Sequence, residues 1–248
     1  MHSTILAVSA PHNNILSLEQ TILLVCAQVT LPLWTPSLVK VGAVGYLLTP
    51  SGSFRTLFNA TSDTDRDRPA GVPKLIGVSI SKQKQNQTGT ITKGMRMLDR
   101  LTSGPSNIKS TYAISAAGET AHLIAEKAEY HYFHSLDEPK KWFRANAEAI
   151  LDAFPNRCLR EELFLVFGTL NAQDHARFVN HGGGEGTFET QFHVHSSRKP
   201  GQPWGYFEPG SSQDTETIFK VSNVGAGLKT VILSRLRFQP DHKEPTGH

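Results

Sequence analysis

Histidine is the residue type in this chain whose spacing comes nearest to a metal site. Of 11 histidines, His193 and His195 stand two positions apart, so on a strand both imidazoles would point to one side and could share a metal ion. The same strand supports another interpretation, because its apolar side chains fall on the opposite face and leave both histidines toward water: Phe188, Phe192 and Val194. We favour the solvent-facing interpretation, keep His193 and His195 as candidate metal ligands, and predict no bound cofactor.

Nucleophilic and nucleotide-dependent chemistry lack the motifs they need. The chain has no nucleophile-elbow, P-loop or zinc-protease motif. Cys158 has Arg157 and Arg160 close by, a setting that can lower a thiol pKa, but a single cysteine of this kind is more often structural. With only two cysteines, Cys26 and Cys158, we expect neither a disulfide framework nor a zinc site, and a reducing cytoplasm is the simplest compartment. We predict that the protein is not an enzyme.

Positive charge is concentrated in residues 74–109, which contain seven lysines and arginines against the single acid Asp99, although the whole chain carries only +3. Residues 95–101 can form a short helix with a basic and an apolar side, a combination that binds anionic lipid at about 1 kcal/mol per basic residue. A solvated basic surface is the alternative. Base-stacking aromatic residues are missing here, so we predict no nucleic-acid partner. The candidate lipid contacts are Lys82, Lys84, Lys93, Arg96 and Arg100.

The elements that must position these residues follow an α+β order. Residues 137–154 predict an amphipathic helix that Ser135 or Asp137 can cap through its side chain and that ends before Pro155. Its polar side carries a second basic patch, made of Lys140, Lys141 and Arg144. Strands are predicted on both sides of the helix: a hairpin around residues 44–58, a strand at 75–81, and an antiparallel meander through 162–195 followed by two further strands.

Residues 38–238 are therefore predicted to form one mainly antiparallel α+β domain, after a weakly patterned lead at 1–37 and before a polar tail at 239–248. The apolar residues 22–34 lack a basic start and are interrupted by Pro32, so we expect a buried or amphipathic segment rather than a signal peptide.

Residues 110–133 form a long two-sided ribbon with unusually small side chains. Ile124, Glu126 and Tyr130 share one side by alternation, and Lys127 and Glu129 share the other. Alanine and glycine occupy the positions where bulky aliphatic residues are expected in a half-buried strand. The ribbon is therefore predicted to pack thinly or to move.

In the order of its elements, the segment STYAISAAGETAHLIAEKAEYHYFHSLDEPKKW, followed by REELFLVFGTLNAQDHARFV, resembles the pore-forming domain of gasdermins, in the short fungal form without a C-terminal repressor domain. The resemblance covers roughly residues 38–238. It implies a cytoplasmic protein that binds acidic phospholipid membranes through basic patches, assembles with copies of itself, and refolds long segments into membrane-spanning hairpins in regulated cell death. It also implies an activating protein partner. Two alternatives remain open: a soluble α+β interaction module with no membrane role, and a metalloenzyme built on His193 and His195.

Overall fold

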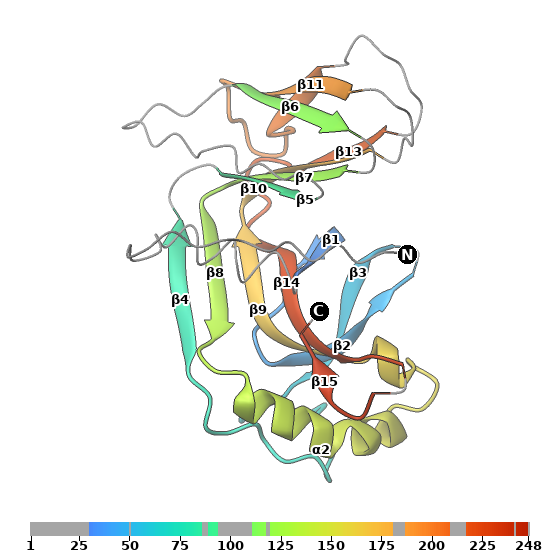
Figure 1. Ribbon diagram of the computed structural model, residues 1–248. Helices are drawn as coiled ribbons and strands as arrows, with labels where there is room; N and C mark the ends of the chain where they lie inside the picture. Colours follow the sequence, from blue (N-terminus) through green and yellow to red (C-terminus); the bar gives the residue numbers. More distant parts are fainter. Residues whose placement is uncertain are drawn as a thin grey trace, which may run out of the picture.

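The residues that the structure describes form three antiparallel sheets and one long helix, which confirms the predicted α+β class. The computed structural model describes residues 30–49, 51–85, 89–93, 111–117, 120–180, 187–208, 217–240 and 242–247. We call the eight-stranded sheet A, the four-stranded sheet B and the three-stranded sheet C. In Figure 1 they follow one another along the molecule, with sheet C at one end, sheet B beneath it, and sheet A between sheet B and the helix.

Sheet A is the largest of the three. It contains β1 (Thr30–Ser37), β2 (Ala43–Leu48), β3 (Ser53–Asn59), β4 (Ile80–Gln85), β8 (Ala128–Phe133), β9 (Phe164–Ala172), β14 (Lys229–Phe238) and β15 (Pro245–Thr246). Strand β9 is its centre, because β14 pairs along one edge while β8 and β2 share the other.

The two smaller sheets stack on one another. Sheet B has the order β13 (Thr217–Val221), β10 (Asp174–Asn180), β7 (Thr120–Glu126) and β5 (Gly89–Lys93). Sheet C has the order β12 (Gly205–Glu208), β11 (Thr187–Val194) and β6 (Thr111–Ala117). An aromatic core joins them, formed mainly by Phe178, Phe192, Trp204 and Phe207.

Helix α2 (Asp137–Ala153) confirms the strongest prediction from the sequence and covers one face of sheet A. Its apolar stripe, which includes Phe143 and Ile150, packs against β3, β9 and β14. The predicted side-chain cap is absent: Leu136 occupies the N-cap position, although Ser135 Oγ accepts a hydrogen bond from the Asp137 N–H at 3.2 Å. A short 3-10 helix, η1 (Arg160–Glu162), precedes β9.

Two strand predictions need correction. The hairpin β2–β3 forms as predicted, but the strand predicted at 75–81 begins only at Ile80, because Gly77 adopts φ 73° and Pro73 restricts the backbone before it. The predicted meander is wrong at both turns: β10 and β11 lie in different sheets and do not pair with each other. Strands β9 and β10 do not pair with each other, because only Gln173 separates them and the chain bends there instead of reversing.

The predicted helix at 95–101 lies outside the described residues. Strands β1 and β15 lie beyond the predicted 38–238 limits, and both pair with β14 in sheet A. In the part of the chain that the structure describes, no helix combines the length and hydropathy needed to cross a bilayer.

Candidate functional site

A pair of strands runs without a change of register from sheet A into sheet B. In sheet A, β8 pairs with β9, including Glu129 opposite Asn171. In sheet B, β7 pairs with β10, including Glu126 opposite Asp174. Each strand has two residues between these pairs, so neither strand slips relative to the other where the sheets change. Residues 120–133 and 168–180 therefore form one long antiparallel ribbon with a single bend (Figure 1).

The bend exchanges the two faces of the ribbon, which corrects the alternation predicted from the sequence. Leu123 and Ala125 of β7 pack in one core with Ala128 and Tyr130 of β8, although strict alternation would put these pairs on opposite sides. The cause is Lys127, whose φ of 52° is a left-handed conformation that non-glycine residues rarely adopt. We call residues 126–128 and 172–174 the hinge.

A buried ion pair lies beside the hinge. The Glu126 carboxylate, only 5% exposed, accepts a hydrogen bond from Arg198 Nη1 at its Oε1 (3.0 Å), and its Oε2 lies 2.8 Å from the same nitrogen. Asp174, on the neighbouring strand, is also buried and directly opposite Glu126. Burial raises the pKa of Asp174 above its ordinary value, and the nearby Glu126 charge raises it further. Arg198 thus pairs with Glu126 where the ribbon turns, and its charge partly offsets the raised pKa of the neighbouring Asp174.

The opposite side of the hinge carries a second set of buried ionisable side chains, His175 and Arg177. Burial, together with the positive charges of Arg177 and Lys229, lowers the pKa of His175 to about 4, so the imidazole is neutral at pH 7. Arg177 is 7% exposed and donates to the backbone carbonyls of Leu33 and Trp34 on β1. Burial lowers the pKa of Arg177 to about 10.

Trp34 extends this contact, because two cations approach its ring: Arg177 at 5.5 Å and Lys220, from β13, at 4.9 Å. Sheet B is therefore attached to strand β1 of sheet A through side chains of β10 and β13. These contacts hold the ribbon in its bent form.

The predicted lipid-contact lysines of β4 lie on an exposed strand but are not free. Lys82 Nζ lies 2.7 Å from the Glu129 carboxylate and Lys84 Nζ lies 3.9 Å from it, and His131 is a third neighbour at 3.5 Å. The ion pair with Lys82 is the main reason that the pKa of Glu129 is below its ordinary value. Both lysines still have about half or more of their side-chain surface in solvent, 48% and 65%.

The second basic patch is exposed on α2 as predicted. Lys141 pairs with Glu138 at 2.9 Å and Arg144 pairs with Glu244, whereas Lys140 makes no ion pair with any described residue. The ion pair with Glu138 raises the pKa of Lys141.

Three members of the predicted set cannot be placed by their side chains. Lys93 ends β5, for which the structure describes only the backbone, and Arg96 and Arg100 lie outside the described residues. The structure therefore brings Lys82 and Lys84 together around Glu129, and separately Lys140, Lys141 and Arg144 along one helix.

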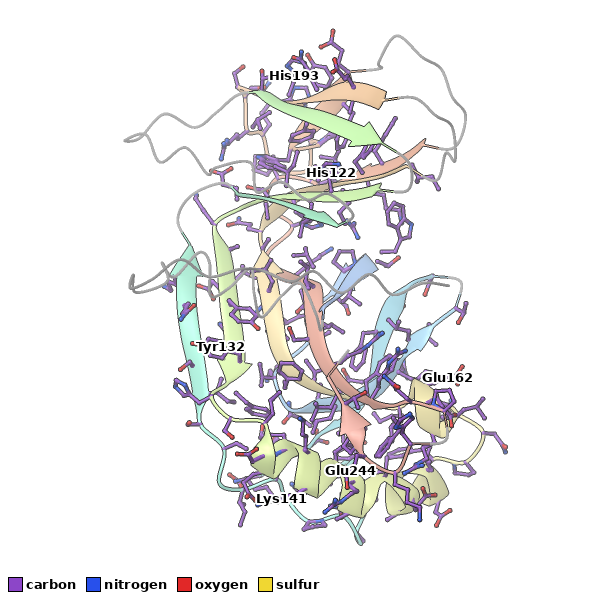
Figure 2. The ribbon with its side chains drawn as sticks, viewed as in Figure 1. His122, Tyr132, Lys141, Glu162, His193 and Glu244 are labelled. Carbon is purple, nitrogen blue, oxygen red and sulfur yellow. The ribbon has the colours of Figure 1, made fainter. Side chains whose placement is uncertain are left out.

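The histidine pair lies at the far end of the molecule from these patches. Figure 2 shows His193 in sheet C and Lys141 on α2, at opposite ends. Both ring nitrogens of His193 have partners: Thr111 Oγ1 at 3.2 Å from Nδ1 and Glu208 at 2.8 Å from Nε2. His195 packs against Tyr206. Within the described ranges, no group of three or more histidine, cysteine or acidic side chains is arranged to hold a metal ion.

Cys158 is a free thiol, and the structure corrects the idea that arginines activate it. Burial raises the pKa of the Cys158 thiol above its ordinary value, and Glu162 adds to this effect.

Sequence reasoning missed the charged residues of the hinge. One signal was present: Arg177 lies inside the otherwise apolar strand sequence ARFV, and a charge at such a position usually indicates a buried partner. Arg198 gave no such signal, because its partner Glu126 is distant in sequence.

A comparison with known protein families and with curated protein sequences finds no match to this chain.

Proposed function

We propose that the protein permeabilises membranes rich in acidic phospholipids, by straightening the bent ribbon and inserting it into the bilayer. The observation that carries the proposal is the constant register of the ribbon through the hinge. Because neither strand has to slide, the two strands can extend together with their pairing kept.

The length of the ribbon supports this function. Each of its strands, 120–133 and 168–180, exceeds the roughly 9–11 residues that a tilted strand needs to cross a bilayer. Backbone groups inside hydrocarbon must find hydrogen-bond partners, and a pair of strands that enters together already satisfies half of them. The other half requires neighbouring strands.

The edges of sheet B favour self-assembly. Strand β13 is one edge, and its Ile218 and Phe219 are 47% and 51% exposed. An unpaired edge with exposed apolar residues is a template for pairing with another chain. We therefore propose a homo-oligomer at the membrane.

The proposed membrane contact is made by the exposed lysines and arginines of β4 and α2, with Lys93, Arg96 and Arg100 as further candidates. The resting location is the cytoplasm, and an activating protein partner triggers the move to the membrane. The role in regulated cell death and the partner rest on the gasdermin resemblance alone.

A soluble interaction module is the second candidate, and the ion pairs favour it. Lys82, Lys84, Lys141 and Arg144 all have carboxylate partners, as expected for charges that only solvate a surface. In that case the hinge would be a fixed corner of the fold.

A leakage assay tests the proposal. Dye-filled vesicles of phosphatidylcholine alone, and of phosphatidylcholine with phosphatidylserine, are mixed with the full chain. We expect release only from the anionic vesicles. The Glu129→Gln variant should bind to the anionic vesicles several-fold more tightly, because the substitution frees the charges of Lys82 and Lys84.

The double variant Lys82→Gln/Lys84→Gln should have the opposite effect and reduce release. Lys243→Gln removes a charge from the exposed tail and is the matched control, with release unchanged. Absence of release from anionic vesicles, with or without Glu129→Gln, would exclude permeabilisation by the chain alone and favour the interaction module.

A further inference from the structure

Strand β14 carries two neighbouring arginines that face away from helix α2. Arg235 and Arg237 are two residues apart, so both point to the same side of sheet A. Leu236 and Phe238 point to the other side, where they join the core beneath α2. Both arginines are half-buried.

Neither arginine has an oxygen acceptor among the described residues. This distinguishes them from every other described arginine that is at least partly buried, each of which donates a hydrogen bond to a carboxylate or a backbone carbonyl: Arg68 to Ser62, Arg160 to His242, Arg177 to Leu33, and Arg198 to Glu126. The contact made by Arg235 is with an aromatic ring, since its guanidinium lies 4.2 Å from the centroid of Phe164.

A third donor joins the two arginines from the last strand. Strand β15 pairs with β14 so that Thr246 lies opposite Arg237, and directly paired residues share a face of the sheet. The Nε atoms of Arg235 and Arg237 and the Oγ1 atom of Thr246 are all buried without a hydrogen-bond partner in the described structure. Buried polar atoms are normally paired, so three orphans at one place indicate a missing acceptor.

The electrostatics agree with this geometry. Burial, with a smaller contribution from the charge of Arg237, lowers the pKa of Arg235 to about 10. Two desolvated cations side by side repel one another, and an anion between them would relieve both the repulsion and the desolvation.

We propose that Arg235, Arg237 and Thr246 form a binding site for a phosphate group. A tetrahedral phosphate carries more acceptor oxygens than a carboxylate, so it can bind two guanidinium groups and a hydroxyl at once, and its oxygens match the fork of a guanidinium. The phosphate can belong to a soluble phosphate ester or to a lipid headgroup. This site is separate from the proposed lipid contacts on β4 and α2, and it does not depend on membrane permeabilisation.

Inorganic phosphate is the first probe. The melting temperature of the full chain is measured in phosphate and in chloride at matched ionic strength, and phosphate should raise it in a saturable way. Arg235→Gln, Arg237→Gln and Thr246→Val should each weaken the apparent phosphate affinity about tenfold, since each removes a hydrogen bond to a charged group. Arg66→Gln removes the same charge from an exposed loop and should leave the phosphate response unchanged.

Two features keep the test decisive. In chloride, Arg235→Gln should melt no lower than the unsubstituted protein, because it removes a desolvated cation that has no counterion. Thr246→Val keeps the net charge, so its loss of response separates a defined site from general electrostatic attraction, even if an arginine variant fails to fold.

Vesicles identify the source of the phosphate. Binding to phosphatidylcholine vesicles that contain phosphatidic acid is compared between the unsubstituted chain and Thr246→Val. A Thr246-dependent response to inorganic phosphate indicates a soluble ligand, and one restricted to vesicles indicates a lipid headgroup. If neither response depends on Arg235, Arg237 or Thr246, the proposal is overturned.

Discussion

His175 should make the folded chain sensitive to mild acid. Its pKa is lowered from 6.5 to about 4 in the folded state, chiefly by burial. The unfolded chain therefore binds a proton more readily than the folded chain between these two values. Stability that is fully present above pH 6.5 is lost as the pH falls toward 4, because protonation favours the unfolded state.

The size of the effect follows from the two pKa values. The lost stability attributable to His175 is about 2 kcal/mol at pH 5 and about 3 kcal/mol at pH 4, relative to pH 7. This loss is a large share of the free energy of unfolding of a typical domain, which is roughly 5–15 kcal/mol. The loss falls on the hinge, because His175 directly follows the Asp174 position of β10.

Urea unfolding at pH 7, 5 and 4 measures this contribution in the His175→Phe variant and the unsubstituted chain. All other titratable groups are the same in both proteins, so the difference between the two pH profiles of unfolding free energy isolates His175. His242→Phe, at an exposed position, is the control and should retain the full acid sensitivity. Equal losses in the unsubstituted chain and in His175→Phe would refute the assignment of a buried neutral imidazole.

Two further predictions concern the hinge. Arg198→Met should lower the free energy of unfolding by about 2–4 kcal/mol, because it leaves Glu126 buried without its cation. In a double-mutant cycle, adding Glu126→Gln should restore much of this loss, and full additivity of the two changes would contradict the ion pair. Lys127→Gly should raise the free energy of unfolding by up to about 1 kcal/mol, whereas Lys127→Val should lower it by about 1 kcal/mol or more, because a φ of 52° suits glycine and strains a β-branched residue. If both substitutions lowered the free energy of unfolding, the left-handed backbone at Lys127 would be contradicted.

Local patterns predicted much of the fold. The stripe that includes Phe143 and Ile150 was enough to predict α2, because helical periodicity is a property of neighbouring residues. The alternation around His193 likewise predicted which side of β11 is buried: Thr190 and Phe192 are buried, and Gln191 is exposed. These features depend on short segments alone.

The hinge and the charged sites depend on contacts between distant segments, so sequence patterns did not predict them. Alternation was extrapolated through Lys127, where the backbone breaks it. The lysines of β4 were counted as free positive charge, although Glu129 on β8 neutralises part of it. The absence of an acceptor for Arg235 can be recognised only once its three-dimensional neighbours are known.

The shared register of the ribbon also couples the lengths of its two strands. An extra residue in one strand at the hinge would shift everything beyond it by one position and turn its buried side chains to the opposite face. An equal insertion in the partner strand would restore the match. Insertions and deletions near residues 127 and 173 should therefore be tolerated only in pairs, one in each strand.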